Sequence, residues 1–162
     1  MKRISITVFV GIYLSISSFA WSYDTAMAKS YAKLFTPVVG AKAGKGLHIM
    51  PPAAFVKNIK EGKEYVVLDV RTPAETRFFG MTLPNSLVIP ANQLFRVENL
   101  DRIPADKPVI IICQLGGRSI ATGTALRHIG FDNVYILKGG LKGLSTFLGP
   151  KQANKKPAST KK

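Results

Sequence analysis

The chain has 162 residues, a single cysteine and a formal net charge of +14. One cysteine excludes an internal disulfide, and two histidines far apart in the sequence indicate neither a metal site nor a Cys–His pair. The charge favours anionic substrates and acidic surfaces, but the cations are scattered and are not interleaved with aromatic side chains. Specific nucleic-acid binding is therefore not expected, and no sequence feature implies a cofactor.

The N-terminal residues 1–20 are typical of a secretory signal peptide. A short basic start, Met1–Arg3, precedes an apolar run without charges from Ile4 to Ala20. We expect cleavage after Ala20, or alternatively after Ala28, in a protein that is periplasmic or secreted. The alternative is a membrane anchor, because an uncleaved run of this length reaches the lower limit for a bilayer span.

Three further segments follow the leader. Residues 21–46 form an N-terminal extension, residues 47–149 form one domain with its core in 61–149, and residues 150–162 form a basic tail. The tail has no large apolar residue and is expected to be disordered. Within the extension, we expect a short helix at Ala28–Phe35 and a loop at Pro37–Gly46.

Strands and helices alternate through the domain. Strands are expected at Leu47–Met50, Glu64–Val70, Leu87–Pro90, Pro108–Ile112 and Asn133–Leu137. Helices are expected at Pro52–Ile59, Pro73–Phe79, Ser119–Ile129 and Leu141–Leu148. This alternation predicts an α/β fold with a central parallel sheet flanked by helices. On one of those helices, the residues expected to pack on the sheet are Ala121, Ala125, Leu126 and Ile129.

Asp69 ends the second expected strand, at the edge of a parallel sheet where functional sites gather. We expect Asp69 to be structural, accepting hydrogen bonds from loop amides or pairing with Arg71. Thr72 is the expected cap of the next helix, with Glu75 at the third helical position.

The only cysteine, Cys113, follows a β-branched run and precedes a glycine-rich turn. A helix N-terminus lowers the pKa of a thiol, and the thiolate is the nucleophilic form of cysteine. Gly116 and Gly117 allow successive amides to point inward as an anion cradle, and Arg118 adds a positive charge. Ser119 is expected to cap the helix. The alternative is a buried, inert cysteine, but packing alone does not require the Gly-Gly-Arg-Ser that follows.

The stretch Cys113-Gln114-Leu115-Gly116-Gly117-Arg118-Ser119 resembles the active-site loop of a rhodanese domain. Three other stretches resemble rhodanese motifs in the same order, namely Val66–Glu75, Leu83–Pro90 and Val134–Gly140. The resemblance covers about residues 47–149 and implies a single-domain sulfurtransferase. It implies a persulfide on Cys113, a substrate loop from Gln114 to Ser119, and a scaffold role for Asp69. Met81 departs from the family, which usually has a histidine there.

The resemblance implies a small anionic sulfur donor such as thiosulfate, and a thiol or cyanide acceptor. A protein that accepts the sulfur is a further possible partner. The alternative is a persulfide carrier or binding module that serves one partner without turnover. A cysteine-dependent phosphatase or an arsenate reductase is less favoured, because phosphatase loops have five residues between cysteine and arginine and this loop has four.

Overall fold

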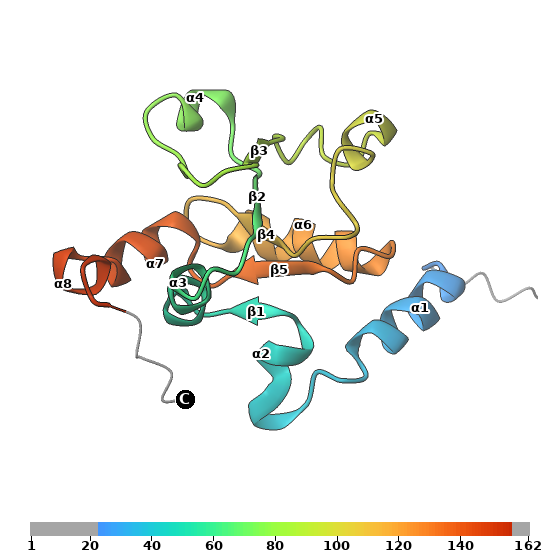
Figure 1. The fold of residues 1–162 in the computed structure, drawn as a ribbon. Coiled ribbons are helices and arrows are strands. Elements are labelled where there is room, and N and C mark those ends of the chain that lie inside the picture. Colours follow the sequence, from blue (N-terminus) through green and yellow to red (C-terminus); the bar gives the residue numbers. More distant parts are fainter. Residues whose placement is uncertain (1–22, 157–162) are drawn as a thin grey trace, which may run out of the picture.

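The computed structural model describes residues 23–156, which form one five-stranded parallel sheet with the order β1-β5-β4-β2-β3 (Figure 1). The strands are β1 (Ile49–Met50), β2 (Val66–Asp69), β3 (Leu87–Val88), β4 (Val109–Ile112) and β5 (Val134–Leu137). The predicted fold class, a central parallel sheet flanked by helices, is confirmed. The predicted signal peptide, residues 1–20, and the last residues of the tail, 157–162, lie outside the described residues.

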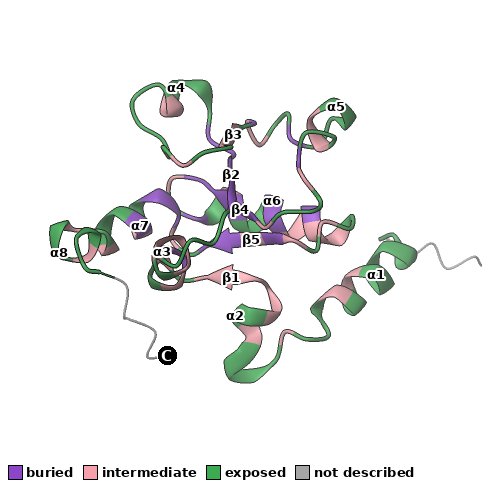
Figure 2. Ribbon diagram, in the orientation of Figure 1, coloured by how far each residue is buried: buried purple, intermediate pink, exposed green. Residues whose placement is uncertain are grey.

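The central strand, β4, and its neighbour β2 lie in the interior of the domain (Figure 2). All their residues are buried, because helices cover both faces of the sheet and β-branched side chains suit such a position. The register pairs Asp69 with Ile112, at the carboxyl ends of the two strands. Asp69 and the residue after Ile112 are therefore brought to the same edge of the sheet.

Helices lie on both faces of the sheet. On one face, α6 (Gly117–His128) and the segment around α5 (Val97–Leu100) cover a cluster that includes Ile111 and Leu126. On the other face, α3 (Pro52–Lys60) and α7 (Gly140–Phe147) cover a cluster that includes Phe55 and Leu144. A short helix, α4 (Pro73–Thr76), follows β2. It is three residues shorter than the predicted helix, which ended at Phe79.

The face of α6 that packs on the sheet differs from the predicted one. Its buried residues are Ser119, Thr122, Gly123 and Leu126, whereas Ala121 and Ile129 are exposed. The reason is a close approach between helix and sheet: a Cβ on Gly123 would lie 2.7 Å from Cγ1 of Ile136. Small residues therefore face the sheet, and the apolar periodicity of the helix is a poor guide to its buried side.

The N-terminal extension is more ordered than predicted. It contains α1 (Thr25–Phe35), a 3₁₀ turn η1 (Gly40–Lys42) and α2 (Ala43–Gly46), so the expected loop at Pro37–Gly46 is largely helical. The ring of Tyr31 stacks on His128 with centroids 3.9 Å apart, and Ser30 Oγ lies 2.7 Å from His128 Nε2. These contacts place α1 against the C-terminal end of α6, a contact between distant segments that no local sequence pattern indicates.

The basic segment from Pro150 begins with α8 (Pro150–Ala153) rather than in disorder. The ammonium group of Lys60 donates hydrogen bonds to the carbonyls of Gln152 at 2.5 Å and Ala153 at 3.0 Å. A cation at the carboxyl end of a helix satisfies carbonyls that have no partner within the helix. This long-range contact explains why the ordered part extends past the predicted boundary.

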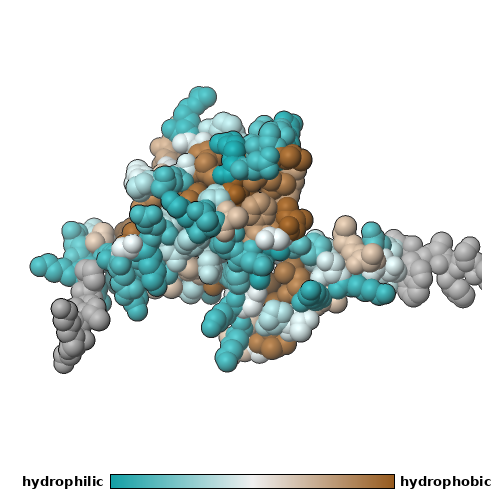
Figure 3. Space-filling model, turned by 45° about the vertical axis from the view of Figure 1, so that its right-hand side comes forward, coloured by the Kyte–Doolittle hydropathy of each residue, from teal (hydrophilic) through white to brown (hydrophobic). Residues whose placement is uncertain are grey.

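The face of the molecule in Figure 3 is mostly hydrophilic, with apolar side chains gathered in its upper part. Among the described residues, the large apolar side chains that are most exposed are Phe78, Val97, Val39 and Leu115. None of the helices in residues 23–156 has the length and apolar character needed to span a bilayer.

Candidate active site

Cys113 directly follows β4, and four residues later the chain has entered α6. Gly116 makes the turn with φ of 99°, a left-handed conformation that favours glycine, and it is the N-cap of the helix. Ser119 was predicted to be that cap, and this is wrong: Ser119 lies inside the first turn of α6 and its hydroxyl faces Cys113 instead. The left-handed glycine lets the helix start two residues earlier.

The N-terminus of α7 fixes the direction of the loop after Cys113. The amide of Leu141 donates to the carbonyl of Cys113 at 2.9 Å, and the amide of Lys142 donates to the carbonyl of Gln114 at 3.0 Å. Both carbonyls therefore point toward α7. The amide of Gly116 points the other way and donates to the sulfur, and the amides of Leu115 and Ser119 also act on it.

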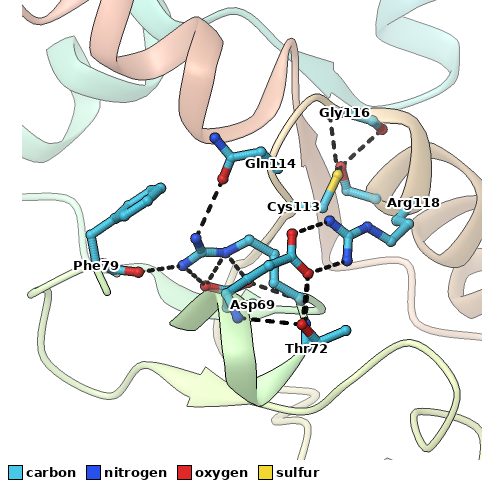
Figure 4. Close-up of polar contacts among 10 residues, drawn as sticks. Asp69, Thr72, Phe79, Cys113, Gln114, Gly116 and Arg118 are labelled. Atoms are coloured by element: carbon cyan, nitrogen blue, oxygen red, sulfur yellow. Dashed lines mark hydrogen bonds and ion pairs between the residues drawn. The ribbon is translucent and has the colours of Figure 1, made fainter. Parts of the chain in front are cut away.

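The sulfur of Cys113 lies inside this cradle (Figure 4). The amide of Gly116 donates to Sγ at 3.1 Å, and Ser119 Oγ lies 3.4 Å from it. The residue is only 1% exposed, so burial raises the pKa of the Cys113 thiol. Hydrogen bonds from the Ser119 hydroxyl and from the amides of Ser119, Gly116 and Leu115 outweigh burial and lower the pKa overall. The site thus stabilises the thiolate, the reactive form.

We expect Ser119→Ala to move the pH midpoint of Cys113 alkylation upward, because the thiolate loses a hydrogen-bond donor. At pH 6 the alkylation rate should fall about tenfold or more, because a hydrogen bond to a charged group contributes about 1.5–3 kcal/mol. A pH series with iodoacetamide measures both values. Thr122→Val is the matched control, since its hydroxyl bonds the carbonyl of Arg118 one turn away; an equal shift in both variants would contradict the assignment.

Asp69 and Arg71 form a buried ion pair beside the cradle, with Arg71 Nη2 at 2.7 Å from Asp69 Oδ2. The same guanidinium donates to the carbonyl of Phe79 at 2.8 Å and lies 3.4 Å from Oε1 of Gln114 (Figure 4). Arg71 is fully buried, and its Cζ lies 4.9 Å from the centroid of the Phe79 ring. Arg71 thus connects the end of β2 to the α4–β3 segment and to the cysteine loop.

Arg118 is paired with Glu75, a residue that the sequence indicated only as part of a helix cap. The guanidinium donates to both carboxylate oxygens, at 2.7 Å and 2.5 Å. Glu75 also completes the capping box with Thr72, as predicted. Hydrogen bonds from Arg118, and then from the Thr72 amide, lower the pKa of Glu75 to about 2. The sequence predicts the contact of this carboxylate with Thr72, because the two residues are close in the chain. It does not predict the contact with Arg118, because α6 is distant in the chain.

The remaining loop residues differ in exposure. Leu115 is exposed, Gly117 is exposed at the first position of α6, and Gln114 is half-buried between Arg71 and α7. Beside Gln114 lies a groove of about 410 Å³ that Phe79, Gly80, Leu144, Leu148 and Lys142 also line. Met81, the residue at which the sequence departs from the resemblance described above, packs against the apolar cluster around Phe55. Within residues 23–156, no three His, Cys, Asp or Glu side chains gather as a metal site would need.

Several known proteins that resemble this chain in sequence and fold are rhodanese-like. A sequence profile for the rhodanese-like domain matches residues 52–146. A sulfurtransferase of Allochromatium vinosum is 31% identical over 85 residues, which cover 52% of this chain and 76% of that protein. A crystal structure of a rhodanese-related protein from Thermoplasma volcanium is 32% identical, with a TM-score of 0.53, and the match covers 62% of this chain and 93% of the other.

The chain therefore belongs to the rhodanese-like domain family. Some relatives are much longer. An adenylyltransferase and sulfurtransferase of Ogataea parapolymorpha is 30% identical over 95 residues, which cover 59% of this chain and 24% of that protein. The chain thus spans about a quarter of the length of that relative.

Proposed function

We propose that the protein is an exported sulfurtransferase that moves sulfane sulfur from a donor such as thiosulfate to cyanide or a thiol. Sulfur is held on the way as a persulfide of Cys113. The observation that carries this proposal is the cradle: the Gly116 amide at 3.1 Å and the Ser119 hydroxyl at 3.4 Å both face Sγ. Such a ring of donors stabilises an anionic sulfur, and a persulfide is one.

The transfer takes two steps through a covalent intermediate. The Cys113 thiolate attacks the outer sulfur of thiosulfate, a new S–S bond forms, and the old S–S bond breaks as sulfite leaves with the electron pair. Cyanide or a thiolate then attacks the outer sulfur of the persulfide, and the Cys113 thiolate is regenerated. No net oxidant is needed, because each step exchanges one bond to the same sulfur. Splitting the transfer in this way predicts ping-pong kinetics.

The loop geometry favours sulfur over phosphate as the transferred group. Cys113 is only 1% exposed, and both terminal nitrogens of Arg118 donate to the carboxylate of Glu75. A phosphate would need several unoccupied donors around the cysteine. The alternative is a carrier that holds sulfur for one protein partner. For a carrier we expect free cyanide or thiols to remove the sulfur from the Cys113 persulfide only slowly.

The test measures sulfur loading and discharge on the purified protein. Thiosulfate is added, intact mass reports a gained sulfur atom, and cyanide is then added while thiocyanate is followed. We expect loading in the wild type and none in Cys113→Ala. A matched variant, Cys113→Ala with Lys107→Cys, places the thiol at an exposed position away from the cradle. If that variant or Cys113→Ala forms thiocyanate as fast as the wild type, the proposal is wrong.

Export remains part of the proposal, and the start of α1 favours one of the two cleavage sites. The helix α1 begins at Thr25, and Asp24 accepts hydrogen bonds from two amides of its first turn. Cleavage after Ala20 leaves this cap in place, whereas cleavage after Ala28 would remove it, so we favour Ala20. Fractionation of cells and the mass of the mature protein test this; an uncleaved chain in the membrane fraction would support the anchor instead.

A further inference from the structure

The positive charges at the mouth of the sulfur site are neutralised by neighbouring carboxylates. Both arginines around it are paired, Arg71 with Asp69 inside the domain and Arg118 with Glu75 nearer the surface. Gln114 and Leu115, the two residues after the cysteine, are neutral. The rim is apolar as well, since the exposed fractions are 66% for Leu115 and 54% for Phe79.

Arg118 is the cation whose pairing matters for the sulfur. Hydrogen bonds to Glu75 are the main reason that the pKa of Arg118 is raised, and charge and hydrogen-bond interactions with Cys113 contribute further. Arg118 is the second residue of α6, and the N-cap of that helix, Gly116, donates to the Cys113 sulfur, so the charge of Arg118 acts at the same helix end. Both of its terminal nitrogens, Nη1 and Nη2, donate to Glu75, however, and an incoming anion would have to compete with a carboxylate for them.

Sulfane donors differ in the charge that they bring to this mouth. Thiosulfate is a dianion, and its reaction with a thiolate gathers three negative charges before sulfite leaves. A thiol persulfide carries at most one negative charge, and its protonated form, R–S–SH, offers its outer sulfur to the thiolate and expels a single thiolate. The Cys113 thiolate attacks that outer sulfur, the S–S bond to R–S breaks with its electron pair, and Cys113–S–SH remains.

We propose that Glu75 determines donor specificity: by neutralising Arg118 it suits Cys113 to a small thiol persulfide rather than to thiosulfate. This inference rests on the proposed sulfur transfer and ranks its donors. The groove beside Gln114, with about 410 Å³ and mostly apolar walls, gives room for the body of a small thiol. Lys142 also lines this groove, but it is exposed to water, where its charge is screened.

Glu75→Gln isolates the charge from the structural role of this side chain. Glutamine also serves in a capping box, so the bond to the Thr72 amide is kept while the charge opposite Arg118 is removed. Glu98→Gln is the matched control, because it removes an equal charge from the first turn of α5. Gln114→Lys is a second variant that adds an unpaired cation next to Cys113 and leaves the Glu75–Arg118 pair intact.

The experiment measures the rate of sulfur loading on Cys113 by intact mass. The probes are sodium thiosulfate and hydroxyethyl persulfide freshly made from sulfide and hydroxyethyl disulfide, with each precursor alone as a blank. In the wild type we expect persulfide to load at least about tenfold faster than thiosulfate. Glu75→Gln and Gln114→Lys should each raise the thiosulfate rate about fivefold or more relative to the persulfide rate. Glu98→Gln should change neither rate.

A pH series of alkylation adds a readout that a purely structural role would not move. Glu75→Gln should shift the Cys113 midpoint to lower pH, because the thiolate then faces a less neutralised Arg118. Wild-type loading that is faster with thiosulfate, or an unchanged donor ratio in folded Glu75→Gln, overturns the inference and leaves sulfur transfer standing. If Glu75→Gln does not fold, Gln114→Lys decides by the same ratio. If neither thiosulfate nor the persulfide loads sulfur on Cys113, the proposed function is overturned as well.

Discussion

Replacement of Arg71 by leucine is expected to lower the free energy of unfolding by about 3–5 kcal/mol, the cost of leaving a buried charge without its partner. Arg71 is fully buried and binds both carboxylate oxygens of Asp69. Without the guanidinium, the carboxylate of Asp69 keeps the hydrogen bond from the main-chain amide of residue 71, at 3.0 Å. The carbonyl of Phe79 loses its donor too, so the α4–β3 segment should become more mobile. Urea titration of the variant measures the loss of stability.

Two further variants test the cause. Asp69→Leu combined with Arg71→Leu removes both charges and should recover a large part of the stability lost in the single variant. Arg102→Leu is the control for arginine removal, because Arg102 is exposed and bonds only Asn99 by its side chain. Its change should stay within about 0.5 kcal/mol. An equal loss in Arg102→Leu, or no recovery in the double variant, would show that the ion pair is not the reason.

Gly140→Ala should reduce sulfur loading of Cys113 at least about a hundredfold, because catalysis depends on placement of the loop to within an ångström. Gly140 has φ of 57°, and a Cβ there would overlap the carbonyl oxygen of Cys113 and lie 2.9 Å from the amide of Gly116. That amide is the donor nearest to the sulfur. The methyl group would push the loop away from α7 and move the Gly116 amide out of hydrogen-bond distance of Sγ.

The matched control is Gly62→Ala. Gly62 also has a positive φ, 81°, but no atom lies within 4 Å of its Cβ position. It therefore pays only the backbone strain of an alanine at positive φ, about 1–2 kcal/mol. Loading rates and unfolding free energies of the two variants separate strain from overlap. Full loading in folded Gly140→Ala would contradict the role of α7 in holding the loop.

The sequence supports the sheet and the position of the cysteine well, because both depend on local patterns. The β-branched run before Cys113 predicts a buried parallel strand, and Asp69 and Arg71 stand close enough in sequence for their pairing to be considered. The capping box of Thr72 and Glu75 is likewise a local signature. Each of these features lies within a few residues of its partners.

The features that the sequence did not predict depend on contacts between distant segments. Glu75 and Arg118 are 43 residues apart in the sequence. The start of α7 at Gly140 is also distant in sequence from the cysteine loop, although the amide of Leu141 binds the carbonyl of Cys113. The start of α6 was misplaced because Ser119 is a frequent cap residue, while the left-handed Gly116 takes that role. Gly123 was overlooked in the buried face because the absence of a side chain gives no apolar signal, although it allows α6 to approach the sheet.

The outer strands β1 and β3 are each two residues long. A long outer strand offers a row of unused main-chain N–H and C=O groups on which another chain can assemble, and such assembly leads to aggregates. Strands of two residues offer very little of this template, and Pro90, just after β3, has no N–H at all. The architecture that brings Asp69 and Cys113 to one rim of the sheet therefore also protects the protein from edge-to-edge polymerisation, and repulsion between copies of a chain with a charge of +14 acts in the same direction.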